Sequence, residues 1–199
     1  MKILYTALFG DYDGVGKIYP QDGWRYLLYT DQDINPAGWE VIKVLPEEDK
    51  IRQARRHKII IPAEVREAEV SIWVDANILP KTKLDTFVGR HTDDFVIRSH
   101  PRGCIYKEGD VCIEMNKGVE SDIYHQLECY MANKYPRDNG MVESGIIIRR
   151  PSADVDSFCR MWMLHVTLFS TRDQLSFPYV AWSKDFKYKI IPWSVLQME

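Results

Sequence analysis

The residues with the clearest chemical potential are Asp75 and Asn77, in the segment Trp73-Val-Asp-Ala-Asn77. They follow an apolar run, and side chains at i and i+2 of an extended segment point to the same side. Two oxygen-bearing side chains placed in this way can hold a hard cation such as Mg²⁺ or Mn²⁺ against a diphosphate. Asp and Asn also favour strand-exit turns through bonds to their own backbone. The pattern alone fits either a metal site or a turn.

A basic cluster precedes this segment and consists of Arg52, Arg55, Arg56, His57 and Lys58. The three arginines lie at i, i+3 and i+4 and would share one face of a helix. The planar guanidinium of arginine suits phosphate oxygens. An ordinary solvated basic face is the alternative interpretation of the same run.

Three further polar residues are candidates for the reaction itself. Asp173 and Gln174 lie near the start of a predicted helix, where they can hold sugar hydroxyls or act at an anomeric carbon. Ser170 and Asp173 also have the spacing of a capping box, although Glu or Gln is the usual partner there. Glu143 precedes an apolar run, and it is either a base, an acceptor-binding group or a surface acid.

The histidines and cysteines show no zinc-binding spacing. His100 lies in a turn-like segment, His100-Pro-Arg-Gly, and is either a site residue or a histidine satisfied by its neighbours. The sequence has four scattered cysteines, two of which, Cys104 and Cys112, could be oxidised together. Scattered thiols are more simply reduced, and the run at 3–9 is too short for a signal peptide. We therefore expect a cytoplasmic protein.

Apolar runs predict the strands that must position these groups. Strands are expected at residues 2–9, 24–30, 39–44, 70–74, 95–99, 145–149 and 188–191. Near-continuous apolar strands are typical of sheets buried on both faces. Helices are expected at about 46–61, 84–90, 104–117 and 120–134, with one capped by Ser152 and one starting near Ser170. This alternation predicts a mostly parallel sheet that binds its ligand beyond the carboxyl ends of the strands.

Composition narrows the classes of function. The chain has 199 residues, 45% hydrophobic and 28% charged, which suits one globular domain. Its net charge of −3 lacks the basic excess of a non-specific nucleic-acid binder. No apolar segment is long enough to span a bilayer. Neither nucleic acid nor a membrane span is expected.

The order of these segments resembles one family over about residues 3–180. The segments that carry the resemblance are Tyr5-Thr-Ala-Leu-Phe-Gly-Asp-Tyr-Asp13, Tyr29-Thr-Asp31, Ala54-Arg-Arg-His-Lys58, Ser71-Ile-Trp-Val-Asp-Ala-Asn77, His100-Pro-Arg-Gly-Cys-Ile-Tyr-Lys-Glu108, Glu143-Ser-Gly-Ile-Ile-Ile-Arg149 and Arg172-Asp-Gln-Leu-Ser-Phe177. They resemble motifs of the glycosyltransferase-like domain of plant mucilage and pollen-tube Golgi proteins and of bacterial polysaccharide loci. The resemblance implies a GT-A-like fold.

The resemblance also implies roles for individual residues. The implied contacts to base and ribose are Phe9, Gly10, Asp11, Tyr12, Asp13 and Asp31. The implied contacts to the donor diphosphate are Arg52, Arg55 and Lys58, and His100 belongs to the same donor-binding set. Asp75 and Asn77 look like a variant of the Asp-x-Asp metal motif. Asp173 and Gln174 are similar to the Asp-Gln pair of retaining, glycogenin-like enzymes, which contacts the donor sugar.

Two departures bear on the metal. Asn77 stands where the motif has a second carboxylate, and this lowers the charge available to a cation. Retaining relatives often supply a late histidine ligand, and no histidine follows His165. Binding of Mn²⁺ or Mg²⁺ is thus expected from the resemblance alone.

The sequence therefore predicts a single GT-A-like α/β domain over residues 1–199, with a mostly parallel central sheet flanked by helices. We expect transfer of a sugar from a nucleotide donor, UDP-linked by family analogy, to a glycan or other hydroxyl acceptor. Because the chain is short for the fold, a homo-oligomer or a partner protein is a candidate source of acceptor contacts. A non-catalytic nucleotide- or glycan-binding domain is the alternative.

Overall fold

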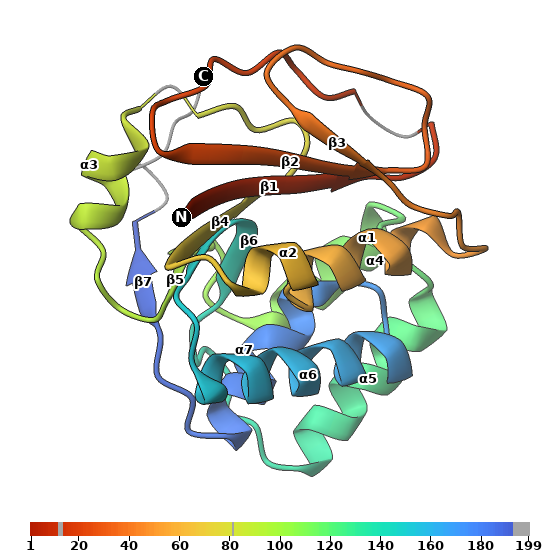
Figure 1. Cartoon of the computed structure of the whole chain (residues 1–199). Coiled ribbons are helices and arrows are strands. Elements are labelled where there is room, and N and C mark those ends of the chain that lie inside the picture. The colour runs from red at the N-terminus through yellow and green to blue at the C-terminus, as the bar shows by residue number, and fades with distance from the viewer. Residues whose placement is uncertain (12–13, 81, 193–199) are drawn as a thin grey trace.

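The computed structural model describes residues 1–11, 14–80 and 82–192, and within them seven strands form one sheet (Figure 1). The strand order is β3-β2-β1-β4-β6-β5-β7. The strands are β1 (Lys2–Leu8), β2 (Trp24–Thr30), β3 (Glu40–Lys43), β4 (Val70–Val74), β5 (Phe95–Ser99), β6 (Val142–Arg149) and β7 (Lys189–Ile191). β6 runs antiparallel to both neighbours, and every other pair is parallel. The prediction of a mostly parallel sheet is confirmed.

The reversed direction of β6 determines which residues meet at the edge of the sheet. β4 and β5 flank β6, and both run opposite to it. The first residues of β6 therefore lie at the edge where β1, β2, β4 and β5 end. The contact is direct, because the amide of Asp75 donates to the carbonyl oxygen of Gly145 at 2.8 Å.

Helices cover both faces of the sheet. They are α1 (Lys50–Ile59), α2 (Ala63–Arg66), α3 (Leu84–Gly89), α4 (Ile105–Glu114), α5 (Glu120–Ala132), α6 (Ala153–Leu168) and α7 (Asp173–Ser183). α1, α6 and α7 lie together on one side of the sheet, and α3 packs against the other (Figure 1). α4 and α5 form a third apolar cluster, which includes Leu175 of α7.

Strand β1 shows why the sheet is buried on both sides. Its Tyr5 packs into the cluster that contains Phe158 and Trp162 of α6, whereas its Leu4 packs with Phe87 of α3. Alternate side chains of a strand point to opposite faces, so a strand covered twice must be apolar throughout. The near-continuous apolar runs in the sequence reflect this double coverage.

Helix α1 starts later than the sequence predicts. Pro46 suggested a start there, but the helix begins at Lys50, and Asp49 caps it by accepting the amide of Arg52 at 2.8 Å. Pro62, which follows the end predicted at about residue 61, precedes the four-residue helix α2, and no helix was predicted there. The cap predicted at Ser152 is confirmed, since its hydroxyl accepts the amide of Val155.

Helix α7 also begins later than expected, at Asp173 rather than near Ser170. The Ser170 hydroxyl donates to the Gln126 amide oxygen at 2.5 Å, and no side chain caps the helix. The capping-box interpretation of Ser170 and Asp173 is therefore wrong. The Asp173 carboxylate is free of that task and takes part in the cluster described below.

Two expectations about the chain as a whole can be compared with the structure. The four cysteines are free thiols, so Cys104 and Cys112 are not joined. In the described ranges, no helix combines the length and the apolar character needed to cross a membrane.

Candidate functional site

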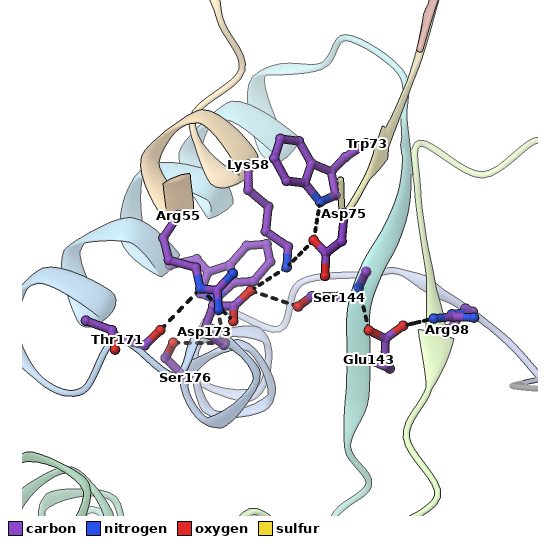
Figure 2. Close-up of polar contacts among 12 residues, drawn as sticks. Arg55, Lys58, Trp73, Asp75, Arg98, Glu143, Ser144, Thr171, Asp173 and Ser176 are labelled. Atoms are coloured by element: carbon purple, nitrogen blue, oxygen red, sulfur yellow. Dashed lines mark hydrogen bonds and ion pairs between the residues drawn. The ribbon is translucent and has the colours of Figure 1, made fainter. Parts of the chain in front are cut away.

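Asp75 is the first residue after β4, and its carboxylate is fixed by two donors (Figure 2). The indole Nε1 of Trp73 donates to Asp75 Oδ1 at 2.9 Å. The ammonium Nζ of Lys58 lies 3.2 Å from the same oxygen. Trp73 is two positions earlier in the chain, so both side chains lie on one side of the strand. Asp75 is thus held in place by its own strand and by α1.

Lys58 is a buried cation between two carboxylates. Its side chain is 1% exposed, and its Nζ lies 3.0 Å from Asp173 Oδ2 as well as near Asp75. A buried charge is costly unless it is paired. Lys58 therefore links the end of β4 to the start of α7, two segments that are far apart in the sequence.

Asp173 has a partner on each carboxylate oxygen. Arg55 Nε lies 3.3 Å from Oδ1, and the Ser144 hydroxyl donates to Oδ2 at 2.7 Å beside Lys58. Burial alone would raise the pKa of Asp173, but Arg55, Lys58 and the Ser144 hydroxyl outweigh it and hold this pKa well below its ordinary value. Asp173 is therefore an ionised carboxylate at neutral pH.

This environment makes Asp173 a poor candidate for the base of an inverting reaction. A carboxylate with a depressed pKa accepts a proton weakly. The arrangement suits a residue that orients Arg55 and Lys58. Gln174, the next residue, is half-buried in the first turn of α7.

Arg52 does not join this cluster, although it precedes Arg55 by one helical turn. Its guanidinium donates to the carbonyl oxygens of Val166 and Phe169 at the end of α6, and to Asp49. Cations at a helix C-terminus stabilise its exposed carbonyl groups. Arg52 thus holds α1 against the end of α6 and does not lie beside Asp75.

Glu143, the second residue of β6, forms a buried ion pair with Arg98 of β5 (Figure 2). Its other oxygen, Oε1, accepts the amide of Gly145 at 2.7 Å. A methyl group on Gly145 would lie 2.6 Å from Glu143 Oε1 and 3.3 Å from Asp75 Oδ2. Glycine at this position therefore lets two carboxylates approach the same small space.

The end of β1 meets Asp31 after β2. Asp31 accepts the amide of Gly10 at 3.0 Å and the ammonium of Lys50 at 2.8 Å. Burial opposes this pairing, yet Lys50 and the Gly10 amide lower the pKa of Asp31. Phe9 is buried, and its ring packs on His57 with the centroids 4.9 Å apart. The Phe9 ring therefore belongs to the core.

The remaining candidates are dispersed. His100 lies close to Arg102 and Glu108, and burial lowers the pKa of its imidazole. Asp11 and Asn77 are exposed. Two further predicted nucleotide contacts, at positions 12 and 13, lie outside the described residues.

Four residues that hold this site together were not predicted from the sequence: Trp73, Arg98, Ser144 and Lys50. Trp73 and Ser144 lie inside motifs that were recognised but were given no role there. For Ser144, a polar residue inside the apolar run of β6 was an available signal. Arg98 and Lys50 carry no such signal. Their importance depends on the pairing of β5 with β6 and on the packing of α1.

The donor set around Asp75 does not fit a divalent cation. Asp75 Oδ1 already accepts from Lys58 and Trp73, and Asn77 offers only an exposed amide. Among the residues that the structure describes, no group of three or more His, Cys, Asp or Glu side chains is arranged to hold a metal. Mg²⁺ and Ca²⁺ sites use several oxygen ligands. The Mn²⁺ or Mg²⁺ expected from the resemblance stays a prediction that these side chains do not favour.

Residues 29–194 match the family described as TOD1/MUCI70, glycosyltransferase-like domain. A curated relative, "Probable hexosyltransferase MUCI70" of Arabidopsis thaliana, is 28% identical over 162 residues. That match covers 71% of this chain but only 27% of the relative.

Among solved structures, the apo form of mouse xyloside xylosyltransferase 1 is similar, with a TM-score of 0.50 and 8% sequence identity. The alignment covers 96% of this chain and 84% of that chain. The mannosyltransferase Ktr4p from S. cerevisiae gives a TM-score of 0.47 and 6% identity, and covers 96% and 68%. At this level of identity the likeness to the mouse enzyme concerns the fold alone.

Proposed function

The chain belongs to the TOD1/MUCI70 glycosyltransferase-like domain family, and from this premise we propose that it transfers a sugar from a nucleotide donor to a hydroxyl group of a glycan or another acceptor. The donor that we propose is a UDP-sugar. Residues 1–199 would act as one GT-A-like domain. The name of the Arabidopsis relative supports a hexose as the transferred sugar.

The observation that carries the proposal is the meeting of four groups at the carboxyl edge of the sheet. Asp75, Lys58, Arg55 and Asp173 come from β4, α1 and α7, and successive pairs among them lie 3.0 to 3.3 Å apart. Open α/β sheets bind ligands beyond the carboxyl ends of their strands. Charged groups gathered there, rather than scattered over the surface, support a site for a charged ligand.

We assign the donor diphosphate to the side of this cluster that Arg55 occupies. The Arg55 side chain is 22% exposed, so its guanidinium is accessible to a ligand, whereas Lys58 is closed off at 1%. Departure of a nucleoside diphosphate leaves negative charge on its oxygens, and fixed cations stabilise that charge as it develops. Asp173 keeps both cations in place for this task.

The nucleoside would lie near the ends of β1 and β2. There the Gly10 amide, Asp31 and Lys50 form a connected polar group. Lys50 is about one-third exposed and remains accessible to a ligand. Because the Phe9 ring is buried, its contribution would come from the backbone beside Gly10.

The reacting face of the sugar would lie toward Glu143 and Gln174. Glu143 Oε1 and Asp75 Oδ2 lie beside Gly145, which has no side-chain carbon to fill the space between them. In an inverting reaction Glu143 would accept the proton of the acceptor hydroxyl. In a retaining reaction Gln174 would face the anomeric carbon. The carboxylate of Asp173 serves in both cases as a positioning group.

The test is a donor screen that measures release of the nucleoside diphosphate from UDP-, GDP- and other nucleotide sugars, with and without hydroxyl acceptors. We expect release from at least one donor, with UDP-sugars the best. Binding without release would favour the alternative, a non-catalytic nucleotide-binding domain. Absence of both binding and release for every donor would refute the proposal.

Two adjacent arginines provide a matched control. Arg55→Ala should lower nucleotide release by about a hundredfold, the range seen when one preorganised electrostatic donor is removed. Arg56→Ala should leave release unchanged, because Arg56 pairs with Glu47 on the exposed side of α1. Equal losses in both variants would indicate a general effect of positive charge rather than a site at Arg55.

A further inference from the structure

We propose that the ammonium of Lys58 takes the place that a divalent cation would have beside Asp75, so that nucleotide-sugar binding at this site requires no metal ion. The inference deepens the proposed function and rests on it, since it specifies how the same site handles the charge of a nucleoside diphosphate. It departs from the Asp-x-Asp metal motif that the sequence resembles.

The charges beside Asp75 are balanced by side chains. The carboxylates of Asp75 and Asp173 are matched by the cations of Lys58 and Arg55, all within one chain of contacts. A divalent cation held by two carboxylates would give the same neutral balance. Here the balance is reached by side chains alone, so a metal ion is not needed to offset the two acids.

Lys58 is also held firmly in this position. Its carbonyl oxygen accepts from Arg149 at 2.7 Å, which fixes the backbone at the end of α1. Its Nζ lies 5.9 Å from the centre of the Trp73 ring and contacts a carboxylate on each side. A metal ion at Asp75 would have to displace this buried ammonium or lie next to a like charge, and both are unfavourable.

Few oxygen atoms beside Asp75 remain available to bind a metal ion. Lys58 and Trp73 occupy Asp75 Oδ1, and the nearby Glu143 Oε1 already accepts the amide of Gly145. Asp75 Oδ2 and the exposed amide of Asn77 remain. Mg²⁺ requires near-octahedral oxygen coordination, and loss of carboxylate ligands lowers the affinity of a cation site. An amide at position 77 is tolerable if no metal ion depends on it. A site that needs no metal ion thus explains both the asparagine at position 77 and the buried lysine at position 58.

The direct test uses Mn²⁺ alone, titrated into the full chain and followed by the electron paramagnetic resonance signal of free Mn²⁺. We expect the signal to grow as it does in buffer. Saturable binding of Mn²⁺ that Asp75→Asn abolishes would overturn the inference. This arm requires no nucleotide and no turnover.

The second arm measures UDP binding by calorimetry in EDTA and then in Mn²⁺. We expect the two dissociation constants to agree within about twofold. Tenfold tighter binding in Mn²⁺, a difference of about 1.4 kcal/mol, would overturn the inference. In Lys58→Met, UDP binding in EDTA should weaken by at least about tenfold, and unchanged binding would also count against the role of Lys58.

Asn77→Asp provides a variant that preserves the core, because position 77 is exposed. It restores the second carboxylate of the motif while Lys58 stays in place. We expect UDP affinity in this variant to remain the same in EDTA and Mn²⁺. If Mn²⁺ tightens binding only after this change, the position beside Asp75 is open to a metal ion and the inference fails.

The outcomes separate this inference from the proposed function. A chain that binds no nucleotide sugar in EDTA or in Mn²⁺ overturns the proposed function, and the nucleotide part of this inference with it. A chain that binds and turns over a donor only with Mn²⁺ keeps the proposed function and overturns the inference alone.

Discussion

Two buried cations lie at the same end of α1, and they differ in whether their partners are charged. Lys58 and Arg149 are each about 1% exposed. The ammonium of Lys58 lies between the carboxylates of Asp75 and Asp173. The guanidinium of Arg149 donates to oxygens without net charge, the backbone carbonyl oxygens of Lys58 and Ile59, together with the Tyr5 hydroxyl.

The difference separates a cation at a polar site from a cation that anchors the fold. Lys58 belongs to a set of charges whose balance changes with pH and with a bound anion. Arg149 holds the last carbonyl groups of α1, which have no partner inside the helix. Burial raises the pKa of Tyr5 to about 12, despite the opposing effect of Arg149, so its hydroxyl stays neutral over the ordinary pH range. The anchor is therefore expected to be insensitive to pH.

The largest expected effect is on activity, in Lys58→Met. Loss of the ammonium leaves Asp75 and Asp173 without their shared cation, so nucleotide release should fall by about a hundredfold to a thousandfold. Release is measured with the best donor, at a temperature where circular dichroism shows the variant folded. A folded variant that retains more than about a tenth of the activity, less than 1.4 kcal/mol of lost stabilisation, would remove Lys58 from the site.

Arg149→Met should instead destabilise the fold. The carbonyl oxygens of Lys58 and Ile59 would remain buried without a donor, at roughly 1–3 kcal/mol each, so we expect about 3 kcal/mol of lost stability. Urea denaturation measures this loss, with Arg160→Met on the exposed side of α6 as the control. A loss no larger than that of the control would mean that Arg149 is not an anchor.

The pH dependence should distinguish the two cations further. Because the pKa of Asp173 is depressed in the folded state, its stabilisation is complete above the unfolded-state pKa of about 3.9 and is lost as pH falls below it. Asp173→Asn should have a lower free energy of unfolding than wild type, and this difference should shrink as pH falls below about 4. The free energy of unfolding that Arg149→Met loses should stay constant over the same pH range, as measured by the same urea titrations. A constant deficit in Asp173→Asn would contradict the charge assignment.

The smallest expected effect is in Gly145→Ala. The added methyl group would crowd Glu143 Oε1 at 2.6 Å and Ile78 Cδ1 at 3.0 Å, which pushes the carboxylates apart. We expect activity to fall by about tenfold, or about 1.4 kcal/mol, with a modest loss of stability. Gly103→Ala has no atom within 4 Å of the new methyl group and serves as the control. Equal activity in both variants would show that the space beside Gly145 is not used.

Much of the sheet could be predicted from sequence, because strands that are buried on both faces appear as nearly continuous apolar runs. β2, β4 and β5 match their predicted ranges at both ends. Each is a run of mostly apolar residues that is followed directly by a polar residue, namely Asp31, Asp75 or His100. The helix ends were harder to predict, since Pro46 and Asp49 are both acceptable starts for α1 by local chemistry. Packing of the helix against the sheet selects between them.

The candidate site could be predicted as a location but not as a set of contacts. Asp75, Lys58 and Asp173 were all expected near the donor, and the structure brings them into contact. Arg52 and Arg55 looked equivalent in the sequence, yet one reaches the end of α6 and the other reaches Asp173. Their separation depends on how α1 is rotated against α6, which no local pattern encodes.

The bond between Lys58 and Asp173 has a consequence for how the protein is made. Asp173 follows Lys58 by more than a hundred residues in the chain. At roughly 5 to 20 residues per second, the ribosome takes on the order of 5 to 20 seconds to deliver the second partner. Until then Asp75 alone of the two native carboxylate partners has been made, so Lys58 can complete its pair of contacts only after β6, α6 and the start of α7 have been translated.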